Sequence, residues 1–183
     1  KAQRDIINSE VEWPFTVVSQ SFTTTAGTAE YSRESDAKTV DYDSFTIQES
    51  ASTAEKQLKY LSFNEYLERR NEADTNPDTS ARALPEFVYK TPDQKIGLSP
   101  VPDKATYTVR YYYYQTTSDL ANNTDVSVIP ERFHDVIINR ARYYVHMLRS
   151  DVQFAQLALR DYKEGLLRLR VELINRKDYM RAV

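Results

Sequence analysis

The sequence predicts an α+β fold with an antiparallel β-sandwich or barrel-like middle and a helical bundle. Short runs of β-branched and aromatic residues, separated by polar turns, fill most of the chain up to residue 116. Long apolar stripes at helical spacing follow Pro130, and a short helical pattern opens the chain. With 183 residues, the chain suits one domain with a real hydrophobic core and room for a small appendage.

The boundaries between these parts follow the changes in pattern. We expect residues 1–12 and 130–174 to form the helical bundle, and 13–129 to form a β-rich domain with a short helix near 62–72. Residues 175–183 read as an extended C-terminal arm.

The first residues resemble the last turns of a helix. Ala2 and Ile6 lean to one side, and no strand alternation appears. Because the chain starts at Lys1 without Met, we expect an upstream piece of this helix. Pro14 disfavours helix at the residue before it, so the helix ends by Trp13. We expect Trp13, the sole tryptophan, to plug the core rather than to form an exposed ligand platform.

The β-rich stretch carries one clear helix signal. Ser62 is followed three residues later by Glu65, the pattern of a capping box at a helix start. Before it, alternation in residues 40–47 slips once, which predicts a bulge or turn near residues 43–44. The middle of the chain is therefore a set of short strands interrupted by one short helix.

Residues 106–116 form the longest predicted strand, and tyrosines lie on both of its faces. One face carries Tyr107, Val109, Tyr111 and Tyr113, and the other carries Thr108, Arg110, Tyr112 and Tyr114. Aromatic side chains on both faces indicate that both are at least partly covered. One cover is the protein's own helices and the other a neighbouring subunit, so Tyr112, Tyr114 and Arg110 are candidate subunit-interface residues.

The two helices after Pro130 are predicted to form an antiparallel hairpin, because only a short break separates them. Pro130 suits the first turn of a helix. The predicted apolar stripe of the first helix comprises Phe133, Ile137, Ala141, Tyr144, Val145 and Leu148. That of the second comprises Phe154, Leu157, Ala158, Tyr162, Leu166, Leu169 and Leu173.

No catalytic, metal or cofactor site is expected. The chain has no cysteine, only 3 glycines, and none of the usual nucleophile, zinc or nucleotide-binding motifs. His134 and His146 are too far apart along one helix to share a metal. No apolar run approaches the length that spans a bilayer. We therefore expect a protein without cofactors that is not an enzyme.

Charge is unevenly distributed along the chain. Acidic residues outnumber basic ones up to residue 128, and the reverse holds from residue 129 onward. This pattern disfavours extensive nucleic-acid binding and suits a protein whose two ends face different partners, although a solvated helical face rich in arginine explains it equally well. From composition alone, the tail after Asn175 is either a frayed end or a docking arm.

The order of several motifs resembles one family. The chain contains AQRDIIN, then WPF, then LSFNEYL from residue 61, IGLSPVPD at 96–103 and VIPERFHD at 128–135, before the two closing helices. This pattern is similar to that of the head-to-tail adaptor (connector) proteins of tailed bacteriophages, the group that includes the tail tubular proteins A of short-tailed phages. The resemblance covers nearly the whole chain.

The resemblance implies a non-enzymatic ring component of the virion neck, usually of twelve copies, assembled in the host cytoplasm. Its expected partners are the portal protein and a tail nozzle or tail tube protein. DNA would pass through the channel during genome ejection without sequence-specific binding, and no membrane is involved. In related adaptors the C-terminal segment clasps the portal, which favours the docking arm and implies portal-docking roles for Arg176, Lys177, Tyr179, Met180 and Arg181.

A second hypothesis comes from the tyrosines themselves. A β-rich domain with aromatic rings on a strand face is also typical of a binding module for carbohydrate or protein. The assembly state separates the two hypotheses, because an adaptor forms rings and a binding module acts as a monomer.

Overall fold

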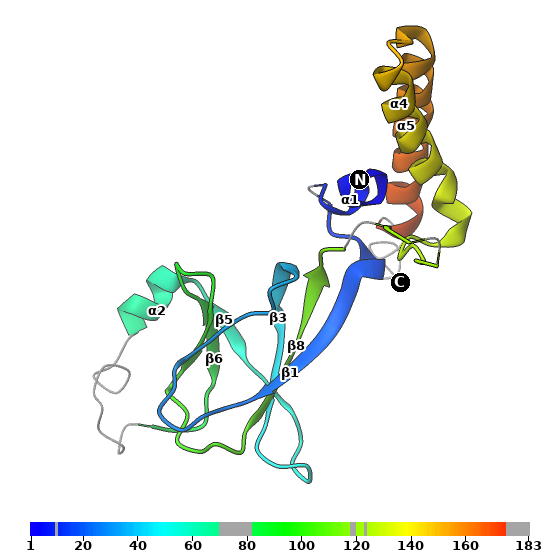
Figure 1. Ribbon diagram of the computed structural model, residues 1–183. Coiled ribbons are helices and arrows are strands. Elements are labelled where there is room, and N and C mark those ends of the chain that lie inside the picture. Colours follow the sequence, from blue (N-terminus) through cyan, green and yellow to red (C-terminus); the bar gives the residue numbers. More distant parts are fainter. Residues whose placement is uncertain (10, 70–81, 118–119, 123, 175–183) are drawn as a thin grey trace, which may run out of the picture. The chain divides into compact units, whose positions relative to one another are not determined.

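A computed structural model describes residues 1–9, 11–69, 82–117, 120–122 and 124–174 (Figure 1). The chain divides into two compact units. The helical unit combines Lys1–Val17 with the chain from Tyr114 onward, and the β unit is Val18–Tyr113.

The β unit is built on two four-stranded sheets. In the first, the strand order is β1 (Val17–Thr23), β8 (Thr108–Gln115), β3 (Ala37–Gln48) and β4 (Lys56–Gln57). In the second, it is β2 (Glu30–Tyr31), β7 (Ile96–Ser99), β6 (Phe87–Lys90) and β5 (Lys59–Leu61). The strand β3, with 12 residues, is longer than β8, with 8, so the prediction that residues 106–116 form the longest strand was wrong.

Of the four strand pairs whose register is described, three are antiparallel and one is parallel. The pairs β3–β4, β2–β7 and β6–β7 are antiparallel, whereas β5 and β6 pair in parallel, with Lys59 opposite Phe87. The chain passes through helix α2 (Phe63–Arg69) between β5 and β6, and such a crossover lets the second strand start at the same end as the first. The second sheet is therefore mixed.

Both sheets contribute to one core, which confirms a sandwich-like middle. Phe45 of β3 and Tyr111 of β8 stack with ring centroids 4.8 Å apart. Val88 of β6 and Leu98 of β7 supply the other sheet's part of the same buried cluster. In β8 burial alternates along the strand, and the face that carries Tyr107, Val109, Tyr111 and Tyr113 is buried. Strands of the second sheet cover this face, so the prediction of a cover by the protein's own helices was wrong for it.

The capping box at the start of α2 is confirmed. The Ser62 backbone N–H donates to Glu65 Oε2 at 2.8 Å, and the Glu65 N–H donates to Ser62 Oγ at 3.3 Å. The bond from the Ser62 N–H, with help from its hydroxyl, lowers the pKa of Glu65. Tyr66 of α2 then stacks on Tyr89 of β6 at 3.7 Å between centroids, which joins the short helix to the second sheet.

The helical unit contains three α-helices and two 3-10 turns among the described residues. They are α1 (Ala2–Ile7), η1 (Pro14–Thr16), η3 (Glu131–Phe133), α4 (His134–Leu148) and α5 (Val152–Leu173). The first of these, α1, packs against α4, and α4 and α5 form the predicted hairpin (Figure 1). The buried cluster of this unit comprises Ile6, Ile7, Trp13, Ile129, Phe133, Val136, Tyr162 and Leu169.

Trp13 occupies the interior of the helical unit, as predicted for a core plug. Its side chain is 1% exposed, and its Nε1–H donates to the Ile6 carbonyl at 2.9 Å. The ring stacks on Phe15 with centroids 5.7 Å apart. The tryptophan therefore ties the turn after α1 back onto that helix.

The two predicted apolar stripes of the hairpin were partly wrong. Four of the predicted members are exposed near the turn that joins the two helices: Val145 and Leu148 of α4, and Phe154 and Leu157 of α5. Because two helices that pack only on each other cover one narrow side of each, the outer parts of a wide stripe stay in water. On α5, Ala155, Ala158 and Gly165 are among the buried residues.

Candidate interaction surfaces

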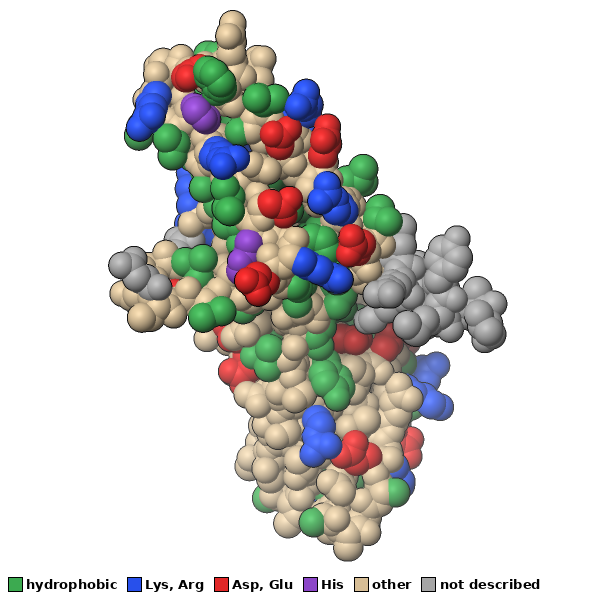
Figure 2. All heavy atoms as spheres, turned by 90° about the vertical axis from the view of Figure 1, so that its right-hand side faces the viewer, with side chains coloured by type: hydrophobic (Ala, Val, Ile, Leu, Met, Phe, Trp, Pro, Cys, Tyr) green, Lys and Arg blue, Asp and Glu red, His purple; other side chains and the backbone are tan. Residues whose placement is uncertain are grey.

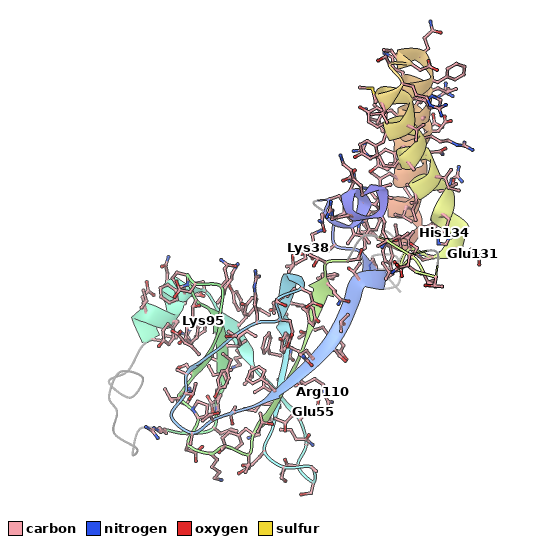
Figure 3. All side chains as sticks on the ribbon, viewed as in Figure 1. Lys38, Glu55, Lys95, Arg110, Glu131 and His134 are labelled. Atoms are coloured by element: carbon pink, nitrogen blue, oxygen red, sulfur yellow. The ribbon has the colours of Figure 1, made fainter. Side chains whose placement is uncertain are left out.

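Arg110 and Tyr112 lie on the outer face of β8, as the alternation predicted. Both are exposed, while the residues between and around them point into the core. The guanidinium of Arg110 pairs with Glu55, with Nη1 2.6 Å from Oε1, and the two side chains lie next to one another in Figure 3. This exposed ion pair contributes little to stability, about 0–1 kcal/mol at most, so both charges are available to a partner.

Tyr112 presents an aromatic ring to solvent. Its side chain is 45% exposed, and its backbone N–H donates to Ser44 Oγ at 2.9 Å. Tyr114 is only half-buried and already belongs to the helical unit. A role for Tyr112, Tyr114 and Arg110 at a subunit interface stays a prediction.

The predicted portal-docking residues Arg176, Lys177, Tyr179, Met180 and Arg181 lie outside the described residues. The docking role of the C-terminal arm therefore also stays a prediction.

A polar cluster in the helical unit joins α1 to α4. Asp5 Oδ2 accepts a hydrogen bond from Arg140 Nε at 3.1 Å and another from the hydroxyl of Tyr144. The Arg140 guanidinium also lies over the Tyr162 ring, 5.0 Å from its centroid. Burial, together with the bond to Asp5, raises the pKa of Tyr144. Sequence reasoning missed this cluster, since nothing local connects Asp5 to a helix more than a hundred residues away.

An open groove of about 550 Å³ lies beside this cluster, between α1 and α4. One of its residues, Gln3, is 4% exposed and donates from Nε2 to Thr117 Oγ1 at 3.0 Å. The groove is lined by Lys1, Ala2, Gln3, Leu120, Ile137, Ala141, Tyr144 and Leu148. This mostly apolar lining suits an inserted side chain and offers no acid–base pair for a reaction.

The outer surface of the hairpin carries many exposed apolar side chains. Leu148 is 88% exposed, and Ile138, Val145, Leu167 and Val171 are each about half exposed. Figure 2 shows hydrophobic side chains interspersed with charged ones along the hairpin. So many exposed apolar side chains on two helices make the hairpin a candidate interaction surface.

The two histidines make local contacts. His134 hydrogen-bonds through Nε2 to the carbonyl of Ile129 at 2.9 Å, and His146 stacks on Phe154 with centroids 5.6 Å apart. Among the residues that the structure describes, no group of three or more histidine, cysteine, aspartate or glutamate side chains is placed to hold a metal ion. None of the described helices is both long and apolar enough to cross a membrane.

Comparison with known proteins points in one direction. A family model described as SU10 adaptor protein matches residues 1–183, the whole length of the chain. No curated protein matches the chain.

Proposed function

The chain belongs to the SU10 adaptor protein family, which makes it a phage structural adaptor, and we propose that its copies form a ring that joins the portal to the tail around the DNA channel. The ring would have twelve copies, assemble in the host cytoplasm and become part of the virion neck. Membership of an adaptor family implies a structural rather than an enzymatic role.

The observation that best supports a ring is the exposed apolar surface of the helical hairpin. In a closed ring each subunit makes head-to-tail contacts, which need two different complementary patches on every copy. Exposed apolar side chains occur on both α4 and α5, including Leu148 and Leu167. The outer face of β8, with Tyr112 and Arg110, adds a further surface for a neighbouring subunit or the tail protein.

The portal would be held by the C-terminal arm. Tyr179 and Met180 would serve as apolar anchors, and Arg176, Lys177 and Arg181 as charged contacts. A short segment with two apolar side chains among cations suits an acidic surface that contains an apolar pocket.

The experiment that tests this role compares the full chain with a variant truncated after Asn175. We expect the full chain to form rings in negative-stain electron microscopy and to be captured by purified portal protein. The truncated variant should keep the circular dichroism spectrum and melting temperature of the full chain but lose portal capture, because it retains every described residue of both hydrophobic cores.

Two results would contradict the proposal. Undiminished capture of the truncated variant would rule out the docking arm. A full chain that stays monomeric with portal protein present, and instead binds glycans, would favour the binding-module hypothesis.

A further inference from the structure

The outer side of α4 carries an apolar stripe at heptad spacing, here called the α4 stripe. It consists of Ile138, Ala141, Val145 and Leu148, at intervals of three, four and three residues. All four side chains are exposed, and Ala141 and Leu148 also form the edge of the groove between α1 and α4. Alternating intervals of three and four are the pattern by which one helix packs along another.

The outer side of α5 carries a second stripe with the same spacing, here called the α5 stripe. It consists of Leu157, Arg160, Glu164, Leu167 and Val171. Its three apolar members are between 44% and 62% exposed. In the middle, Arg160 lies near two carboxylates of its own helix, with Nη2 3.3 Å from Asp161 Oδ1 and Nε 3.8 Å from Glu164 Oε1. These are exposed pairs that contribute little to stability, so Asp161 can still be approached by a second cation.

The contact within the hairpin uses other faces of both helices. Gly165 of α5 lies so close to Val136 that a Cβ at this glycine would be 2.9 Å from Val136 Cγ2, and Arg140 lies over Tyr162. The two stripes therefore point away from the hairpin's internal interface. These close contacts also show which residues lie level with each other: Val136 with Gly165, and Arg140 with Tyr162.

Charges beside the two stripes are complementary when two hairpins stand side by side. Asp135 and Arg142 lie seven residues apart along one edge of the α4 stripe. Asp161 and Arg168 lie seven residues apart along the matching edge of the α5 stripe. If two copies stand parallel, α4 of one runs antiparallel to α5 of the next. Asp135 then comes level with Arg168, and Arg142 with Asp161, so both pairs are attractive.

Resting on the proposed ring, we propose that the α4 stripe of each copy packs antiparallel onto the α5 stripe of the next copy. The apolar side chains supply the association energy, and the two charge pairs set the register. The small side chain of Ala141 leaves room for the Arg160–Glu164 pair of the neighbour. The two stripes differ, so the contact is head-to-tail and continues around a ring.

Charge reversal tests this contact. Arg142→Asp alone or Asp161→Arg alone places like charges opposite each other and should weaken self-association at least about tenfold. The double variant, with both reversals in one chain, should recover most of the parent's assembly. Analytical ultracentrifugation and negative-stain microscopy measure this, and unchanged circular dichroism shows that each variant folds.

A mixing experiment tests the head-to-tail arrangement. Val145→Glu breaks the α4 stripe and Leu157→Glu breaks the α5 stripe, so each variant alone should be monomeric. Mixed in equal amounts they should form a dimer and nothing larger, because one intact stripe remains on each chain. Val126→Glu, at a residue that is 85% exposed and outside both stripes, is the matched control and should assemble normally.

The failures of the two proposals are distinguishable. Rings that persist in both stripe variants, or a double reversal that does not recover assembly, would overturn the stripe contact and leave the adaptor ring intact. A mixture of the stripe variants that stays monomeric would overturn the head-to-tail pairing. A parent chain that never associates, even with portal protein, would overturn the ring and the stripe contact together.

Discussion

At the scale of single residues, neighbouring tyrosines of one strand serve different purposes. Tyr111 is 1% exposed and stacks on Phe45, whereas Tyr112, the next residue, is 45% exposed. Burial, followed by the nearby charge of Glu34, raises the pKa of Tyr111 to about 12. Burial also raises the pKa of Tyr42 and Tyr107 to about 12. The inward tyrosines thus build the core, and the outward one is available to a partner.

These raised pKa values predict loss of stability at high pH. The unfolded-state pKa of tyrosine is about 10, so the neutral folded form is favoured. The preference for neutral tyrosine stabilises the folded state fully below about pH 10, and this stabilisation is lost as the pH rises toward about 12. Denaturant unfolding followed across this range should show a steep fall in stability for the parent. Tyr111→Phe should flatten that fall, and the control Tyr112→Phe should leave it unchanged; equal effects of the two would contradict the assignment.

At the scale of elements, the hairpin depends on small residues between its helices. Gly165 faces Val136 at a distance that leaves no room for a side chain, and Ala155 and Ala158 are buried farther along the same helix. Because small residues form the contact between α4 and α5, several larger apolar residues of both helices lie on the outer surface. The same geometry explains why Val145 and Leu157 are exposed although they belong to apolar stripes.

Gly165→Leu should therefore destabilise the helical unit. A large side chain at this point forces the helices apart, and overpacking of this kind costs about 1–3 kcal/mol. Lys163→Leu, at an exposed position on the same helix, is the matched control and should change stability by no more than about 0.5 kcal/mol. Urea unfolding of both variants decides the matter, and equal stabilities would show that the helices do not approach closely at Gly165.

At the scale of the whole molecule, each unit has its own hydrophobic core. The buried clusters of the β unit and of the helical unit share no residue. The sole tryptophan, Trp13, lies in the helical core, while the β core is rich in tyrosine. Fluorescence of Trp13 therefore reports on one unit, and tyrosine near-ultraviolet dichroism reports chiefly on the other.

Core truncations should separate the two signals. Leu98→Ala in the β core should lower the unfolding midpoint seen by tyrosine dichroism more than that seen by Trp13 fluorescence. Leu169→Ala in the helical core should do the opposite. Each loses about 2–5 kcal/mol in its own unit, because both leucines are almost fully buried. If both probes shift together in both variants, the units unfold as one.

Local patterns were sufficient to predict much of the architecture. Ser62 and Glu65 predicted a helix start because a capping box needs only residues three apart, and the structure contains both bonds. Alternation separated the two faces of β8, and helical spacing identified the hairpin. The ordered motifs also indicated the adaptor family, which the full-length match shows.

Some features of the candidate surfaces could be predicted from local sequence patterns, and others could not. Sequence alone placed Tyr112 and Arg110 on an outward face, because strand alternation is a local property. It did not predict the Asp5–Arg140 contact, the parallel pairing of β5 with β6, or the exposure of Val145 and Leu148. Each of these depends on which segment lies alongside, and a period along one helix or strand shows that a face is apolar without showing what covers it. The sequence by itself thus determined the elements and the family, and the tertiary structure decided which apolar faces close the core and which stay available for assembly.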